Sequence, residues 1–150
     1  MYLISAYFDE NTNKILKHLQ QRIADKTGND FMIRNNVMPH LTISAIEARN
    51  VDVLIPAFEK VCRGKLQSLE EKSVANNTIN IVSVGQLVPR VIYAAPVLNE
   101  YMMNLSISIY NEFATLPETN ISKFYQPYSW MPHITLGKFL DKEQMRQAFA

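Results

Sequence analysis

Two short segments carry the same chemically active residue types at the same spacing. Residues 38–42 read Met-Pro-His-Leu-Thr, and residues 131–135 read Met-Pro-His-Ile-Thr. The chain has only three histidines, so two of them lie in near-identical pentapeptides. An imidazole titrates near neutral pH, and a threonine hydroxyl both donates and accepts hydrogen bonds. Two such pairs acting together suit proton transfer beside a small anion such as a phosphate.

Each pentapeptide is interpreted as part of a β-strand. Because side chains alternate along a strand, His40 shares a face with Thr42, and His133 shares a face with Thr135. With a rise of about 3.3 Å per residue, the two polar side chains of a pair stand roughly 6.6 Å apart, which suits contact with one anion. The apolar residues of opposite parity are expected in the core: Leu41, Ile43, Ile134 and Leu136.

The four polar residues predict phosphate chemistry by acid and base catalysis. One neutral histidine of the pair His40 and His133 would take a proton from water, and the other, protonated, would donate to the departing oxygen. Thr42 and Thr135 would hold the phosphate oxygens. For one isolated pentapeptide a packing role is the better interpretation, but packing does not explain a repeated His and Thr. We expect no metal and no cofactor, since neither histidine has partners at ligand spacing.

The predicted elements around the two pentapeptides also repeat. A strand, a helix and the histidine-containing strand follow one another twice, and the repeats span approximately 2–45 and 90–140. In the first copy the strand covers 2–8, and the helix begins after Thr12 as N-cap and ends near Gly28. In the second copy the strand covers 90–97 and the helix 99–114, and about five extra residues fall in 115–127.

Further elements are predicted between and after the repeats. A short helix over 52–63 would be capped by Asp52, with Pro56 in its first turn. Strands are expected around 65–73 and 78–88, separated by a turn at Asn76-Asn77. A last helix is expected to begin near Asp141.

The two His-x-Thr motifs, each followed by an apolar residue, resemble those of the two-histidine (2H) phosphoesterase superfamily, which includes 2'-5' RNA ligase-like proteins and cyclic nucleotide phosphodiesterases. The likeness covers nearly the whole chain, including the segment Val-Gly-Gln-Leu-Val-Pro-Arg-Val-Ile-Tyr-Ala-Ala-Pro-Val at 84–97. The sequence departs from many members at Leu87, where they have an aromatic residue.

The resemblance implies a fold, an activity and site residues. The fold would be α+β and bilobal, a single duplicated domain over 1–150 in which two antiparallel sheets line a central groove with helices outside. The activity would be hydrolysis of 2',3'-cyclic or 2'-5' phosphodiester bonds of nucleotides or RNA ends. His40 and His133 would be the acid–base pair, and Thr42 and Thr135 the phosphate-binding residues.

Several other residues are candidate substrate contacts. Arg90 and Arg34 could contact phosphate. Three aromatic residues that precede the second motif could stack on a base, or could equally serve packing alone: Tyr125, Tyr128 and Trp130. His18 lies on the predicted first helix and is interpreted as a surface or boundary residue.

Composition excludes some partners and leaves alternatives open. The 15 basic and 14 acidic residues give a net charge of +1, which does not fit binding along long duplex nucleic acid. The single cysteine, Cys62, is expected to be buried. The sequence shows no signal or membrane-spanning segment, so we expect a cytoplasmic protein. We also expect a monomer. A nucleotide-binding or RNA-end-binding module without turnover, a 2'-5' RNA ligase, and a purely structural domain remain alternatives.

Overall fold

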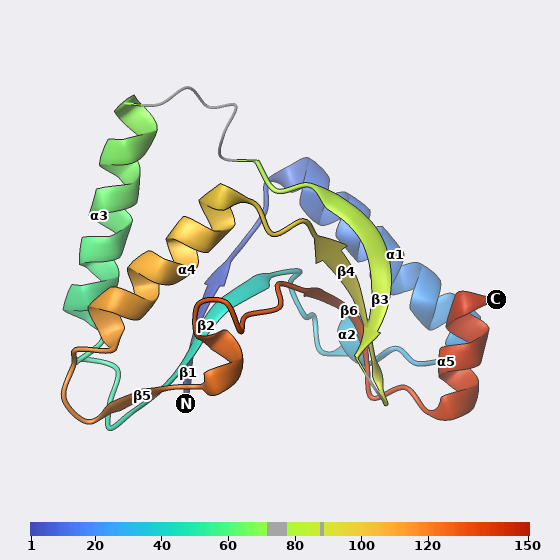
Figure 1. Cartoon of the computed structure of the whole chain (residues 1–150). Coiled ribbons are helices and arrows are strands. Elements are labelled where there is room, and N and C mark those ends of the chain that lie inside the picture. The colour runs from blue at the N-terminus through green and yellow to red at the C-terminus, as the bar shows by residue number, and fades with distance from the viewer. Residues whose placement is uncertain (72–77, 88) are drawn as a thin grey trace. The chain divides into compact units, whose positions relative to one another are not determined.

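The computed structural model describes residues 1–71, 78–87 and 89–150. Its elements divide between two three-stranded antiparallel sheets and the helices that pack on them, so the predicted α+β class is confirmed (Figure 1). By contacts the chain forms two compact units, each assembled from three separate segments. Unit 1 comprises Met1–Ser5, Thr42–Asn80 and Val97–Pro132, and unit 2 comprises Ala6–Leu41, Ile81–Pro96 and His133–Ala150.

Unit 1 is built on a sheet with the strand order β1-β2-β5. The strands are β1 (Tyr2–Ala6), β2 (Leu41–Ala48) and β5 (Thr119–Ile121), and Ile46 of β2 is the cross-strand partner of Ile121. Every residue of β2 from Leu41 to Ile46 is buried. The strand is therefore covered on both faces, instead of alternating between core and solvent.

Two helices pack together in unit 1. These are α3 (Ile55–Glu71) and α4 (Glu100–Phe113), and an ion pair of 2.8 Å joins Lys60 of α3 to Glu112 of α4. The α4 helix begins after Asn99, whose side chain accepts a hydrogen bond from the backbone N–H of Met102, as expected for an N-cap.

Unit 2 is built on the sheet β3-β4-β6, with β4 in the centre. Its strands are β3 (Ile81–Leu87), β4 (Val91–Pro96) and β6 (Ile134–Lys138). The helices α1 (Glu10–Thr27) and α2 (Phe31–Arg34) pack on β6, and α5 (Lys142–Phe149) packs on α1. This arrangement covers one face of the sheet, where Ile92, Ala94, Ile134 and Leu136 are buried.

Several predicted helix ends are confirmed and others are wrong. Gly28 ends α1 with a φ of 69°, and Asp141 caps α5 in a reciprocal capping box with Gln144. The N-cap of α1 is Asp9 and not Thr12, because the Asp9 carboxylate accepts hydrogen bonds from both the N–H and the hydroxyl of Thr12. The α3 helix begins at Ile55, so Asp52 lies too early to cap it, while Pro56 does fall in the first turn.

The predicted strand at 65–73 is wrong over 65–71, which continues α3. Its last two residues, the turn at Asn76-Asn77 and the end of the strand predicted over 78–88 lie outside the described residues. The segment 115–127, where extra residues are predicted, contains β5 and a short 3-10 helix, Lys123–Tyr125. Cys62 is partly exposed, not buried as expected.

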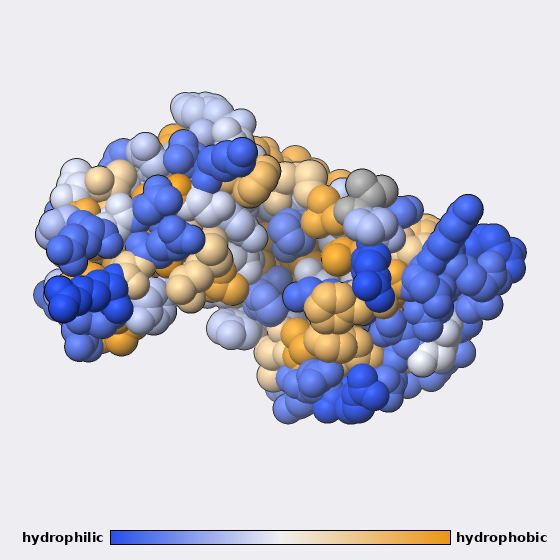
Figure 2. All heavy atoms as spheres, turned by 90° about the horizontal axis from the view of Figure 1, so that it is seen from below, coloured by the Kyte–Doolittle hydropathy of each residue, from blue (hydrophilic) through white to orange (hydrophobic). Residues whose placement is uncertain are grey.

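Hydrophilic and hydrophobic residues are intermixed on the face of the molecule drawn in Figure 2. None of the helices in the described part of the chain is long and apolar enough to cross a membrane.

Candidate functional site

The two motif histidines occupy matched positions in the chain. His40 comes directly before β2, and His133 comes directly before β6, so each histidine precedes its strand and does not lie within it. In both motifs the proline before the histidine and the apolar residue after it are buried, while the histidine is partly exposed. Both histidines belong to unit 2. The buried neighbours hold the backbone on each side, and the imidazole remains accessible.

The ring orientation of His40 is set by a backbone hydrogen bond. Its Nδ1 lies 2.8 Å from the carbonyl oxygen of Met38. Because a carbonyl only accepts, Nδ1 must carry the proton of this bond, and in the neutral ring Nε2 then holds the lone pair. His40 is therefore arranged to exchange a proton at Nε2.

Each motif histidine also lies against a tyrosine ring. The ring centroids of Tyr7 and His40 are 6.2 Å apart, and those of Tyr93 and His133 are 5.8 Å apart with an interplanar angle of 74°. Tyr7 is 67% exposed, whereas Tyr93 is only partly exposed. Neither tyrosine was singled out from the sequence.

The motif threonines have neighbours at corresponding positions of the two repeats predicted from the sequence. The Thr42 hydroxyl lies 3.4 Å from that of Ser5, and Thr135 is the cross-strand partner of Tyr93. When Ala6 is matched with Ala94, Ser5 and Tyr93 correspond. This internal alignment is the signal that could have identified both residues from the sequence.

The threonines differ in exposure. Thr42 lies in unit 1 and is 8% exposed, whereas Thr135 lies in unit 2 and is partly exposed. The pairing of β6 with β4 shifts register between Ile92 and Tyr93, next to Thr135. Irregularities of this kind re-aim side chains and are common beside functional sites. Of the two hydroxyls, that of Thr135 is the more accessible to a ligand.

Arg90 does not lie beside the second histidine. Its guanidinium donates hydrogen bonds of 3.2 and 3.0 Å to the carbonyls of Leu140 and Phe139, just past the far end of β6. The five-residue strand spans roughly 16 Å, so Arg90 is about that far along the sheet from His133. Arg90 therefore lies near the end of β6 that is remote from His133, and its role as a substrate contact stays a prediction.

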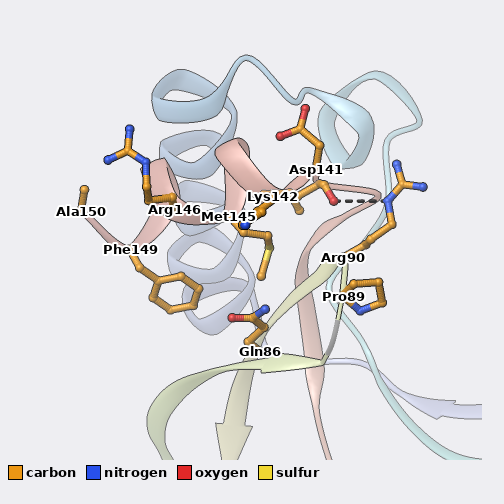
Figure 3. Close-up of a pocket in the computed structure, with 10 residues that line it drawn as sticks. Gln86, Pro89, Arg90, Asp141, Lys142, Met145, Arg146, Phe149 and Ala150 are labelled. Carbon is orange, nitrogen blue, oxygen red and sulfur yellow. Dashed lines mark hydrogen bonds between the residues drawn. The ribbon is translucent and has the colours of Figure 1, made fainter.

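Arg90 instead lines a separate pocket of about 830 Å³ between the β3–β4 turn and α5 (Figure 3). Arg146 also lines this pocket. Its guanidinium donates hydrogen bonds to the Glu143 carboxylate, and this interaction raises the pKa of Arg146 and lowers the pKa of Glu143. None of the motif residues lines this pocket.

Among the aromatic candidates, Trp130 is the clearest case. It is 5% exposed, and its indole N–H donates a hydrogen bond of 3.1 Å to the carbonyl of Thr42. The structure therefore favours packing over base stacking for this residue. Tyr128 is 83% exposed, and burial raises the pKa of the partly buried Tyr125 phenol.

The remaining basic and histidine candidates lie on helices. Arg34 is exposed at the end of α2, with its guanidinium 3.7 Å from the Asp30 carboxylate, and His18 is exposed on α1 as expected. No group of three or more His, Cys, Asp or Glu side chains in residues 1–64, 78–87 and 89–150 is placed to hold a metal ion.

Comparison with protein-family models gives no match, and comparison with curated proteins gives no match either.

Proposed function

We propose that the chain is a metal-independent phosphodiesterase of the two-histidine type. It hydrolyses 2',3'-cyclic or 2'-5' phosphodiester bonds of nucleotides or RNA ends, with His40 and His133 as its acid–base pair. The proposal includes the duplicated, groove-containing fold that the sequence resemblance implies. The observation that carries it is the matched setting of the two histidines, each partly exposed between a buried proline and a buried strand residue and each against a tyrosine ring.

The reaction needs one histidine in each protonation state. The neutral imidazole removes a proton from a water molecule as its oxygen bonds to phosphorus. The bond from phosphorus to one ribose oxygen breaks, and the protonated imidazole donates its proton to that oxygen. The product is a phosphomonoester. Nε2 of His40 suits either role, because Nδ1 is committed to the Met38 carbonyl.

The threonines stabilise the phosphate in this scheme. Thr135 is partly exposed, so its hydroxyl can donate to a non-bridging oxygen as negative charge develops there. Thr42 retains the same predicted role. Ligation is the reverse type of reaction and uses the same groups.

Hydrolysis of adenosine 2',3'-cyclic monophosphate in the presence of EDTA tests the proposal. The chain offers a matched control, since His18 is exposed on α1 and outside both motifs. We expect turnover by the wild type and by His18→Ala, and a loss of roughly 100-fold or more in His40→Ala and in His133→Ala.

Two outcomes would count against the proposal. Turnover that is unchanged in both motif variants would remove the histidine mechanism. Tight binding of the nucleotide by the folded wild type, measured by calorimetry, without product from any cyclic or 2'-5' linked nucleotide would instead identify a binding module.

A further inference from the structure

The Tyr93 ring leans over the neighbouring strand at a glycine. Gly85 of β3 is the cross-strand partner of Tyr93 on β4. A Cβ atom on Gly85 would lie 2.5 Å from both Cζ and Oη of Tyr93 and 2.9 Å from Cε1. Since real Cβ atoms do not approach other atoms so closely, the ring occupies the space that a side chain at position 85 would need. Glycine is what allows the ring to lie there.

This ring lies on the sheet face opposite the one on which α1 and α2 pack. Residues on both sides of it in β4, Ile92 and Ala94, point to the buried face, so Tyr93 points to the opposite one. The same face carries Thr135, its direct partner on β6. The His133 ring stands edge-on to Tyr93 at 5.8 Å. An aromatic surface, an imidazole and a hydroxyl are thus adjacent within unit 2.

We infer that Tyr93 is the base-stacking residue of the site, so that the substrate is a phosphodiester carrying an unpaired nucleobase. This inference rests on the proposed function. Every nucleobase has a π-face, and aromatic side chains displayed on a sheet recognise unpaired bases by stacking on them. Leu87 lies two residues beyond Gly85 on β3 and on the same face. Tyr93 therefore places an aromatic ring close to Leu87, the position where many members of the superfamily have an aromatic residue.

A pair of substrates separates base recognition from phosphate chemistry. Adenosine 2',3'-cyclic monophosphate and glycerol 1,2-cyclic phosphate both contain a five-membered cyclic phosphate, but only the first has a base. We expect Tyr93→Leu to raise KM for the cyclic nucleotide by roughly 10- to 100-fold and to leave the glycerol ester unaffected, whereas Tyr93→Phe should keep the wild-type KM. Gly85→Ala should resemble Tyr93→Leu, because the new Cβ displaces the ring.

The chain provides controls for both substitutions. Tyr101 is a partly exposed tyrosine on α4, and a Cβ added to Gly64 of α3 would meet no atom within 4 Å. Tyr101→Leu and Gly64→Ala should therefore leave KM for both substrates unchanged. Equal losses on both substrates in Tyr93→Leu would show that Tyr93 acts on the phosphate site alone, and would overturn the stacking role.

A binding measurement separates this inference from the proposed function and needs no variant that must fold. Adenosine 2'-monophosphate should shift the ring-proton NMR signals of Tyr93 in the wild type, because a stacked base alters their magnetic environment. If that shift is seen but no phosphodiester is hydrolysed, the stacking role stands and the proposed function fails. If hydrolysis is seen and the nucleotide leaves the Tyr93 signals unchanged, the stacking role is wrong and the proposed function stands.

Discussion

The Nδ1 atom of His40 lies 2.8 Å from the carbonyl oxygen of Met38, two residues earlier in the same motif. The bond is local, so it forms whenever the Met-Pro-His segment adopts this conformation before β2. The bond requires the proton of the neutral imidazole to be on Nδ1. The basic nitrogen is then Nε2, which does not contact this carbonyl.

The neutral tautomer of His40 can be observed directly. We expect the Nδ1–H form to predominate in the neutral ring, because only a protonated Nδ1 can donate to the Met38 carbonyl. Long-range ¹H–¹⁵N NMR spectra of the imidazole, recorded at a pH where the ring is neutral, distinguish the two tautomers. His18, exposed on α1, is the internal reference. A predominant Nε2–H form of His40 would contradict the assignment.

Replacing Trp130 should affect stability and not substrate recognition. Trp130→Phe keeps an aromatic ring but removes the N–H that donates to the Thr42 carbonyl, leaving a buried acceptor without this partner. A cost of about 1–3 kcal/mol in the free energy of unfolding is expected. Chemical denaturation measures it, and KM for a cyclic nucleotide should stay unchanged. A large rise in KM without loss of stability would restore the stacking role.

The parts of the fold that local chemistry determines could be predicted from the sequence. Gly28 and Asp141 mark helix ends because a left-handed C-cap and a capping box depend on a few adjacent residues. The strand predicted over 65–73 was wrong because Lys, Leu, Gln and Glu, which favour helices, continue past Gly64, and α3 tolerates that glycine.

The contacts around the candidate site could not be predicted without the tertiary structure. The histidines and threonines were found because their types repeat, whereas the contact of Tyr93 with Gly85 depends on the register between β3 and β4. The surroundings of Arg90 depend on the tertiary structure for a related reason. Arg90 begins the second predicted repeat, but its guanidinium donates hydrogen bonds to carbonyls beyond the far end of β6.

The cap of α1 predicts an acid-sensitive contribution to stability. Hydrogen bonds from the side chain and backbone of Thr12 lower the pKa of Asp9 below the ordinary aspartate value of 3.8. A carboxyl whose pKa is lowered by folding contributes stability that is present above the unfolded-state pKa and is lost as the pH falls through the folded-state pKa.

Asp9→Asn isolates this effect, because asparagine caps helices about as well as aspartate but does not titrate. Between pH 5 and a value below 3.8, the unfolding free energy of the wild type should fall more steeply than that of Asp9→Asn, as measured by denaturation at each pH. Parallel pH dependences in the two proteins would show that the cap carboxylate gains no stabilisation on folding.

The pH dependence of kcat/KM for a 2',3'-cyclic nucleotide, measured with EDTA present, tests the acid–base pair most directly. If one histidine must be neutral and the other protonated, the rate falls on both sides of an optimum, and the profile is bell-shaped within the range of about pH 5–9 where histidine titrates. His40→Asn or His133→Asn should remove one limb together with most of the activity, while Thr135→Val should slow turnover and keep both limbs. A rate that is independent of pH across this range would contradict catalysis by the two histidines.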